Sequence, residues 1–345
     1  MKRYAMVIAL VAIWIFFEVR TGIFLHPVNM ANLLKQMSVT GVLAVGMLFV
    51  IVSRQIDLSV GSLVGLAGGI AAMTQGAGLA ASFLCAIAIG VIAGALQGAL
   101  VAYANIPSFI VTLGGLLTWR GVILYLSKGE TIPVRLPVFR MLGVALLTPA
   151  SGIAIGAAAI AALVWFSRDR VSTIVMSIVI VVFVAMMNAQ GGVPLPVIVM
   201  LIVAGAAHFI TQNTVFGRYL YAIGSNPDAA RLSGINNRKH ILFAFALLGA
   251  LVGVASLLHT GRVGSASPDA GTLMELDAIA ACVIGGTSLM GGRGKVTGAL
   301  LGALIMASLD NGMSLLSVEN ATQYIIKGAV LVAAVGFDMA GRQSR

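Results

Sequence analysis

Long apolar runs alternate with short polar connections along the whole chain. A helix of about 20 apolar residues crosses the hydrocarbon core of a bilayer. We identify twelve runs that are long enough, or nearly so, at residues 4–18, 38–53, 58–75, 79–103, 106–126, 148–166, 171–188, 193–213, 240–260, 274–290, 296–313 and 323–340. This pattern predicts an all-α polytopic membrane protein in which about ten to twelve segments are full spans. The first run follows Lys2 and Arg3. Because Glu18 and Arg20 come after it without a small-residue cleavage site, we expect an anchor rather than a signal peptide.

Two of these segments are interrupted by small and acidic residues. IDLSVGSLVGLAGGIAAMTQ carries Asp57 near its start, and MELDAIAACVIGGTSLMGG carries Glu275 and Asp277 and ends in two Gly pairs. Such segments are typical of half-helices or re-entrant pieces, which occur at membrane depth only where protein or a wet cavity covers them. Asp57 precedes Gly68-Gly69 much as Asp277 precedes Gly285-Gly286, which suggests an inverted repeat, although the spacings differ.

One polar stretch, residues 216–240, separates two long apolar runs. Asn226 is a preferred N-cap residue, Pro227 suits the first helical turn, and Asp228 favours the positive end of a helix. Gly234 is a typical stop, because glycine adopts the left-handed conformation at low cost. The stretch therefore predicts a helix of about two turns, too short to be stable alone in water. We expect either the rest of the protein or a partner to hold it.

Composition excludes a soluble domain. The chain is 59% hydrophobic and 9% charged, with a mean hydropathy of +1.04, so too little polar surface exists to cover a water-soluble fold. The net charge of +10 does not indicate nucleic acid, because membrane proteins keep Lys and Arg on their cytoplasmic side. Cys85 and Cys282 both lie in apolar runs, so we expect unpaired packing residues rather than a disulfide.

The distribution of Lys and Arg among the connections predicts the orientation. With the amino terminus inside, the inner side receives Lys2, Arg3, Arg54, Arg168, Arg170, Arg218, Arg231, Arg238, Lys239, Arg293, Lys295, Arg342 and Arg345. The outer side receives Arg20, Lys35, Lys128, Arg135, Arg140 and Arg262. This excess on the inner side predicts that both termini and residues 216–240 are cytoplasmic.

Several sequence blocks resemble a known transporter family. They are LSVGSLVGLAGG preceded by Ile56-Asp57, GRYLYAIGSNPDAARLSGIN, ELDAIAACVIGGTSLMGGRG, SLDNGMSLL and QYIIKGAVLVAAVGFD. In this order they are similar to permease subunits of bacterial ATP-binding-cassette importers for monosaccharides, the ribose, xylose and arabinose group, and the likeness runs from Leu33 to Asp338. Room for two extra spans, at 148–166 and 171–188 joined by residues 167–170, resembles the xylose type.

The resemblance implies a single transmembrane permease domain over residues 1–345 in the bacterial inner (cytoplasmic) membrane. Its partners would be a second copy of the chain or a second permease, a cytoplasmic ATPase and an extracytoplasmic sugar-binding protein. ATP and Mg would bind to the ATPase, so we expect no cofactor in this chain. The residues agree with that expectation, because no G-x-x-x-x-G-K-[ST] occurs and GGTSLMGGRGK lacks the required spacing.

The resemblance also implies a role for residues 214–239, as a cytoplasmic coupling loop that transmits closure of the ATPase to the spans. The residues expected to couple are Asn226, Pro227, Asp228, Ala229, Ala230, Arg231, Leu232, Ser233, Gly234 and Ile235. Ala229, Leu232 and Ser233 share a helix face by their spacing, with Ala230 at its edge. The alternative is an ordinary capped loop whose Leu232 packs back onto its own spans.

Charged residues within apolar segments are costly in lipid and normally face a partner or a wet cavity. One hypothesis is a sugar path lined by polar side chains, namely Asp57, Ser59, Asn105, Phe109, Thr112, Glu275, Asp277, Thr287, Asp310 and Asn311. The alternative, which we favour for any single charge, is that Arg120 or Lys327 pairs with Asp310 or Asp277 and sets helix register.

The sequence does not indicate an enzyme or a metal centre. His26, His208, His240 and His259 are scattered without ligand spacing, and Gly61-Ser62 and Gly264-Ser265 have no placed histidine or acid partner, so we assign neither metal ligands nor catalytic residues. Two alternatives to a sugar permease stay open. They are an importer permease for nucleosides or branched-chain amino acids and, differing more, an ion-coupled secondary transporter.

Overall fold

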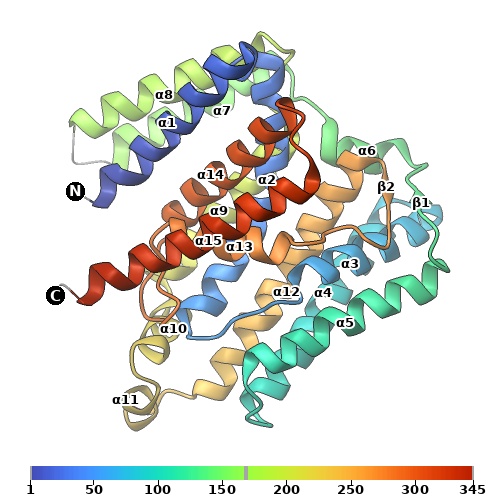
Figure 1. The fold of residues 1–345 in the computed structure, drawn as a ribbon, viewed down its shortest axis with the longest axis vertical. Helices are drawn as coiled ribbons and strands as arrows, with labels where there is room; N and C mark the ends of the chain where they lie inside the picture. Colours follow the sequence, from blue (N-terminus) through green and yellow to red (C-terminus); the bar gives the residue numbers. More distant parts are fainter. Residues whose placement is uncertain (1, 167–169, 344–345) are drawn as a thin grey trace.

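The computed structural model describes residues 2–166 and 170–343. The helices are α1 (Lys2–Thr21), α2 (Pro27–Val52), α3 (Val60–Thr74), α4 (Leu79–Ala102), α5 (Ser108–Ser127), α6 (Pro137–Val144), α7 (Pro149–Phe166), α8 (Arg170–Asn188), α9 (Leu195–Asn213), α10 (Val215–Ser225), α11 (Pro227–Leu232), α12 (Asn237–Val263), α13 (Met274–Ile284), α14 (Val296–Leu315) and α15 (Asn320–Gln343) (Figure 1). A 3-10 helix, η1 (Gln75–Ala77), follows α3, and two short strands, β1 (Ile132–Pro133) and β2 (Ser265–Ala266), pair antiparallel. The described residues are thus almost entirely helical where they are regular, with this small strand pairing and an isolated bridge between Leu146 and Pro194. Of the predicted connection between α7 and α8, residues 167–169 lie outside the described part.

The apolar runs predict the helices well, and the largest difference in a boundary is at α2. This helix begins at Pro27 rather than near residue 38, because polar residues in its first turns find partners inside the protein. Asn29, for example, exchanges side-chain hydrogen bonds with Asn311 of α14, at 2.8 and 3.0 Å. Polar positions that a hydropathy pattern counts against a span are therefore satisfied here by tertiary contacts.

Seven helices in the described residues are long and apolar enough to cross a membrane: α2, α3 together with η1, α4, α5, α9, α12 and α14. The segment at 58–75, expected to be a half-helix, is among them, because η1 extends α3 to 18 residues. In contrast, α13 has only 11 residues and spans about 16 Å at about 1.5 Å per residue. This is about half of the hydrocarbon thickness, so the expectation of a short helix holds for the segment that begins at Met274.

Two groups of three helices exchange their packing partners. In the first group, α2 is followed by α3 and α4, and in the second, α12 is followed by α13 and α14. Helix α2 packs against α13 and α14 of the other group, while α12 packs against α3 and α4. Each long helix is therefore held by the pair that follows the other one, and α2 is so enclosed that Leu43, Met47 and Ile51 are fully buried.

Glycines allow α4 and α12 to approach backbone to backbone. Gly90, Gly94 and Gly98 recur every four residues on α4; Gly90 faces Gly249 and Gly253 of α12, whereas Gly94 and Gly98 lie against residues 242–246 of that helix. A Cβ atom added at Gly90 would clash with the Gly249 carbonyl, and one added at Gly249 would clash with the Gly90 carbonyl. Small residues at this spacing are typical of tight helix pairs in membranes, where dispersion contacts replace the hydrophobic effect as the driving force.

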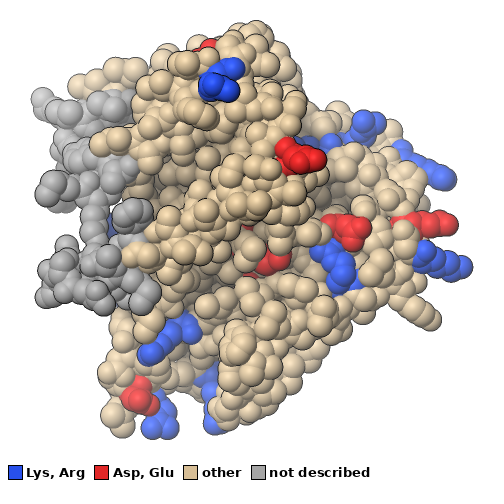
Figure 2. Space-filling view, in the orientation of Figure 1, with Lys and Arg blue, Asp and Glu red and all other residues tan. Residues whose placement is uncertain are grey.

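The peripheral elements mark two ends of the bundle. In Figure 1 the start of α1, the end of α15 and α11 lie on the left side of the molecule, whereas β1, β2 and α6 lie on the right. Helix α1 packs on α14 through a hydrogen bond of 2.9 Å from Trp14 Nε1 to Ser308 Oγ. On the face shown in Figure 2, charged side chains gather at the lower left and toward the right edge, and large areas between them carry few. Cys85 and Cys282 are both free, as predicted.

We expect Gly90→Leu to disrupt folding, because the added side chain would push apart two backbones that cannot relax by changing a rotamer. The measurement is the thermal midpoint and monodispersity of the detergent-solubilised protein. Gly114→Leu on α5 is the matched control, because no atom lies within 4 Å of a Cβ placed there. Equal midpoints for the two variants would contradict the close contact between α4 and α12.

Candidate functional site

The short helix α11 is built as its sequence predicts. Asn226 caps it, since its Oδ1 accepts hydrogen bonds from the backbone N–H groups of Asp228 and Ala229, both at 3.1 Å. Pro227 occupies the first helical turn. Gly234 follows the helix with φ of +84°, the left-handed conformation that ends helices. The predicted start and stop are both confirmed.

Helix α11 presents an apolar side chain to its surroundings. Leu232 is 84% exposed, and its predicted face-mates Ala229 and Ser233 are exposed as well. Ala230, expected at the edge of that face, instead turns inward and is only 5% exposed. The alternative in which Leu232 packs back onto its own spans is therefore wrong, because that side chain touches little of the chain.

Side-chain and backbone contacts anchor α11 to the bundle. Asn237 Nδ2 at the start of α12 donates to the Pro227 carbonyl at 2.8 Å. On the other side of α11, Gly224 of α10 packs directly on the carbonyl of Val52, at the end of α2. The backbone N–H of Gly292 donates a hydrogen bond to the same carbonyl at 2.9 Å. Helix α11 is thus bonded directly to α12, and α10, which precedes it, packs on α2 and on the connection between α13 and α14.

Tyr221 adds a second tie between α10 and that connection. Its hydroxyl donates to the Gly294 carbonyl at 3.0 Å. Burial raises the pKa of Tyr221, so the phenol keeps its proton and remains a donor at physiological pH. The sequence alone did not single out Tyr221 or Asn237. A polar side chain next to a short capped helix was the one available signal for them.

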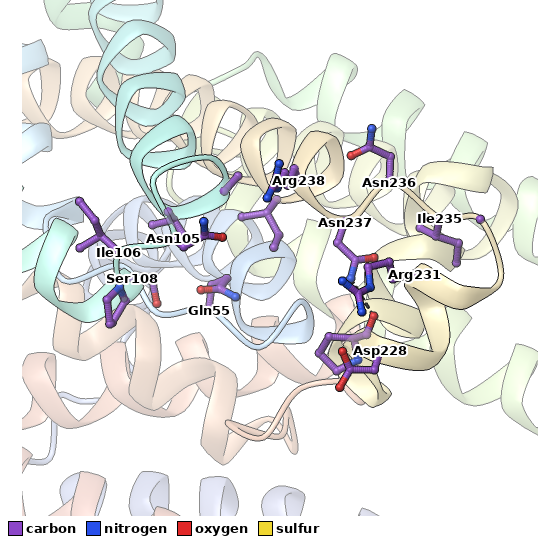
Figure 3. A pocket seen from close by; sticks show the side chains of 16 residues that line it. Gln55, Asn105, Ile106, Ser108, Asp228, Arg231, Ile235, Asn236, Asn237 and Arg238 are labelled. Atoms are coloured by element: carbon purple, nitrogen blue, oxygen red, sulfur yellow. Dashed lines mark hydrogen bonds between the residues drawn. The ribbon is translucent and has the colours of Figure 1, made fainter.

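A groove of about 840 Å³ opens beside α11. Figure 3 shows Asp228 and Arg231 of α11 on one side of it and Asn105, Ile106 and Ser108 of the connection between α4 and α5 on the other. Gln55 from the connection between α2 and α3, and Arg238 from the start of α12, also line it. The groove therefore lies between the predicted coupling helix, the start of α12 and the two connections α2–α3 and α4–α5.

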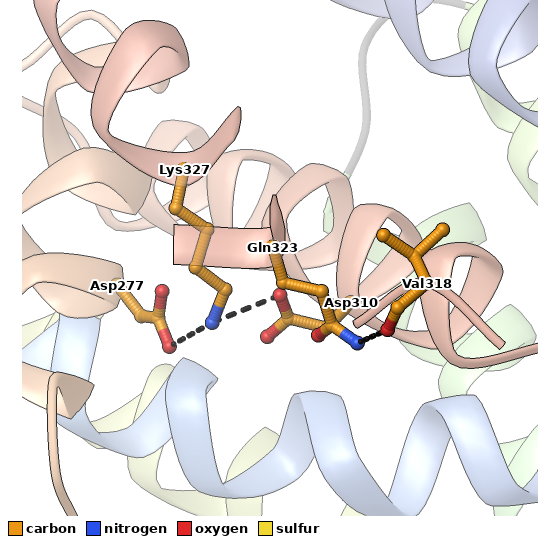
Figure 4. A network of polar contacts seen from close by, with 5 residues as sticks. All are labelled: Asp277, Asp310, Val318, Gln323 and Lys327. Carbon is orange, nitrogen blue, oxygen red and sulfur yellow. Dashed lines mark hydrogen bonds and ion pairs between the residues drawn. The ribbon is translucent and has the colours of Figure 1, made fainter. Parts of the chain in front are cut away.

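A buried charge cluster lies elsewhere, at the contact of α13, α14 and α15. Lys327 Nζ lies 3.1 Å from Asp277 Oδ2 and 2.9 Å from Asp310 Oδ1 (Figure 4). The lysine side chain is 19% exposed and the two carboxylates are 11% and 15% exposed. Pairing of Lys327 with both acids is confirmed, and it ties three helices together at the point where an unpaired charge would be costly.

Arg120 does not pair with either of these acids, so that part of the expectation is wrong. It donates instead to the backbone carbonyls of Pro268 and Ala270, the latter at 2.9 Å. Arg120 thereby holds the connection between β2 and α13. The Pro268 and Ala270 carbonyls lie outside any helix, and the guanidinium supplies hydrogen-bond donors to them.

Asp57, Ser59 and Gln97 form a second buried polar group, and Thr112 Oγ1 donates separately to the Ile56 carbonyl at 3.4 Å. Asp57 Oδ1 accepts hydrogen bonds from Ser59 N and Ser59 Oγ, both at 2.7 Å. Gln97 Nε2 of α4 donates to Ser59 Oγ at 2.8 Å, and all four side chains are at most 2% exposed. The Asp57 carboxylate thus stabilises the turn that leads into α3.

The ten residues predicted to line a path do not converge on one passage. Asn105 and Phe109 are exposed at the start of α5, beside the groove. Glu275 is buried against Gly61 of α3, and Thr287 is buried after α13. Asn311 is bonded to Asn29, and Asp277 and Asp310 are bonded to Lys327. Asn311, Asp277 and Asp310 therefore have structural partners. Glu275 and Thr287 are buried elsewhere, away from the groove beside Asn105.

Comparison with known proteins identifies the family. A family model described as "Branched-chain amino acid transport system / permease component" matches residues 29–335. The chain is 43% identical to the "Xylose transport system permease protein XylH" of Haemophilus influenzae, over 99% of this chain and 97% of that protein. It is 39% identical to the "Ribose import permease protein RbsC" of Escherichia coli strain K12, over 90% of this chain and 85% of that protein. The chain belongs to this permease family.

As a member of this permease family, the chain is a multi-pass protein of the bacterial inner membrane. No solved structure gives a significant match. The matched region, residues 29–335, includes α11, the groove and the charge cluster. The features described above therefore belong to the permease region itself.

We expect Lys327→Met to lower the stability of the protein by about 3 kcal/mol or more, because it leaves two buried carboxylates without their shared partner. A triple variant, Lys327→Met with Asp277→Asn and Asp310→Asn, should recover most of the loss, since neutral amides do not repel each other. Thermal unfolding in detergent measures both. A single variant as stable as the unmodified protein would show that the ion pairs do not hold α15.

Proposed function

We propose that this chain is the transmembrane permease subunit of an ATP-binding-cassette importer for a monosaccharide, with a pentose such as xylose favoured. The observation that carries the proposal is the identity of 43% to permeases named for xylose along almost the whole of both chains. The segments α7 and α8 fall in the part of the chain where the sequence resembles the xylose type. The family model is named for branched-chain amino acids, so amino acids remain the alternative cargo to be tested.

The proposed complex has three kinds of partner. A cytoplasmic ATPase binds ATP and Mg and supplies the energy, and an extracytoplasmic binding protein delivers the sugar. A second copy of this chain completes the membrane part. The chain itself then acts as a transport subunit and not as an enzyme, which agrees with a sequence that lacks a nucleotide-binding motif.

Residues 226–235 are the proposed contact with the ATPase. Three features support this assignment: the 84% exposed Leu232, the capped helix that holds it, and the contacts that tie α11 to α2, α12 and the connection after α13. An isolated helix of six residues has no stability of its own, so its contacts with neighbours decide its position. A push on α11 would therefore move the ends of central helices.

The proposed topology has both termini and α11 in the cytoplasm. The excess of Lys and Arg on that side supports it, as does the position of α11 on the same side as both ends of the described chain (Figure 1). We also propose that the α2–α3–α4 and α12–α13–α14 groups form an inverted repeat. Their exchanged packing supports this, because each long helix meets the pair that follows the other.

The proposed sugar path is lined by those polar residues that do not already form an ion pair or an amide pair. Asp57 and Ser59 are buried and hydrogen-bonded to each other, Thr112 is buried and bonds the neighbouring Ile56 carbonyl, and Asn105 lines the groove. Hydroxyl-rich ligands suit such donors and acceptors, and weak binding lets the cargo leave. Phe109, Glu275 and Thr287 remain candidates, while the ion pairs of Asp277 and Asp310 and the amide pair of Asn311 favour structural roles.

We expect Leu232→Asp to leave membrane insertion intact but to abolish transport and co-purification with the ATPase, because a charge would replace the apolar contact. Pull-down of the tagged ATPase from solubilised membranes and sugar uptake measure the two effects. Leu232→Met is the matched control, since it keeps an apolar side chain of similar size. Normal ATPase binding by Leu232→Asp would exclude α11 as the coupling element.

We expect xylose, or another pentose, to stimulate ATP hydrolysis severalfold when the permease is reconstituted with its ATPase and binding protein. The screen compares pentoses, hexoses, nucleosides and branched-chain amino acids at equal concentration, with the proton and sodium gradients dissipated. Stimulation by amino acids alone would refute the sugar assignment. Uptake that stops when the gradients are dissipated, although ATP is present, would indicate a secondary transporter.

A further inference from the structure

Three basic residues, Lys35, His259 and Arg262, lie on the two packed helices α2 and α12, toward the end of the bundle opposite α11. Lys35 lies in the first part of α2, and His259 and Arg262 lie in the last part of α12, three residues apart and so on neighbouring positions of one helix face. The end of α2 and the start of α12 both meet the α10–α11 region, so the two helices run antiparallel. Lys35 and Arg262 are therefore at the same level of the bundle.

The spacing along the helices brings them to the same contact. Gly46 of α2 faces Leu248 and Leu251 of α12. Lys35 lies eleven positions before Gly46, and Arg262 lies eleven positions after Leu251. Eleven residues are about three helical turns, so both side chains return to the face on which the helices touch. In agreement, the positive charge of Arg262 acts on both Lys35 and His259.

The four helices that pack on one another at this level supply no counter-charge. Helices α2, α6, α9 and α12, which pack on one another here, contain no Asp or Glu at all. Glu275, in the next helix along the chain, interacts instead with Arg120, Asp277 and Asp57. Among the described residues the salt bridges join only Lys327 to its two aspartates. Lys35 and Arg262 thus repel each other, and no acid among the described residues forms a salt bridge with either of them.

Two nitrogen atoms of the cluster are also left without a hydrogen bond. Arg262 Nε and His259 Nδ1 are both buried and find no partner among the described residues. Arg140 of α6 does not relieve the excess charge, because its guanidinium lies over Gly264 at the end of α12 and adds a further positive charge. Buried donors and like charges gathered at one place are costly unless an anion accepts their hydrogen bonds.

We infer that Lys35, His259 and Arg262 form an anion-binding site that takes a phosphate group. An oxygen of the anion would accept from Arg262, where the guanidinium and phosphate geometries match, and Lys35 would supply a second charge. The phosphate can come from an anionic lipid headgroup or from solution. The site requires neither the cargo nor ATP, so it stands or falls separately from the proposed transport function.

The test uses the purified full-length protein in nanodiscs and measures its thermal midpoint. In the first arm, phosphatidylcholine nanodiscs are titrated with inorganic phosphate against chloride at equal ionic strength. In the second arm, phosphatidylglycerol replaces part of the phosphatidylcholine, without added phosphate. The variants are Lys35→Gln and Arg262→Gln, with Lys35→Arg as the charge-keeping variant. Arg135→Gln is the matched control, because that exposed arginine lies outside the cluster.

We expect the midpoint to rise in at least one arm for the unmodified protein, Lys35→Arg and Arg135→Gln. Each of the two Gln variants should require roughly tenfold more phosphate or anionic lipid for half of the effect, since each loses a charge-assisted contact. A rise in the phosphate arm assigns the anion to solution, and a rise confined to the second arm assigns it to lipid. No rise in either arm, or an equal rise in both Gln variants, would overturn the site.

Without an anion, a further difference is expected. Lys35→Gln removes one of the repelling charges, so in phosphatidylcholine and chloride it should be at least as stable as the unmodified protein. This readout remains available if Arg262→Gln does not fold. A large loss of stability in Lys35→Gln under these conditions would mean that Lys35 already has a partner within the protein, and the site would be refuted.

Discussion

Polar groups at membrane depth find no water, so this chain has to pair them with one another. The pairs determine much of the architecture. Lys327 joins α13, α14 and α15 through two aspartates, Arg120 holds the backbone that leads into α13, and Asn29 and Asn311 link the start of α2 to the end of α14. Each pair joins segments far apart in the sequence. The free-energy cost of leaving a polar group unpaired therefore favours the tertiary arrangement that brings these segments together. The basic cluster at Lys35 departs from this rule, which is why an external anion is inferred there.

Close packing supplies the second part of the framework. The glycines of α4 and α12 bring two backbones into direct contact, and α2 is enclosed by helices of the other group. Such interfaces are rigid, because their atoms have no room to rearrange. Rigid helices are suited to carry a displacement from one end of the bundle to the other. The contacts of Gly224 with Val52 and of Asn237 with Pro227 connect α11 to this framework.

The same physical chemistry explains why α11 stands out. Helix α11 keeps Leu232 84% exposed at the end of a well-capped helix. An exposed apolar side chain gains little for folding, which agrees with the proposed contact between Leu232 and a partner. The likeness to sugar permeases makes an ATPase the proposed partner of α11. The groove of about 840 Å³ lies beside this helix.

The sequence by itself determined the class, the positions of most helices and the capped start and stop of α11, because hydropathy and capping are local properties. It also indicated that intramembrane charges would be paired. Tertiary structure decided which partners they took: Lys327 met both aspartates, Arg120 met carbonyls, and Ala230 turned inward while Leu232 stayed exposed. The early start of α2 and the meeting of Lys35 with Arg262 likewise depend on helices distant in the sequence. These partners and boundaries depend on how distant helices pack against one another, and a local sequence pattern does not contain that information.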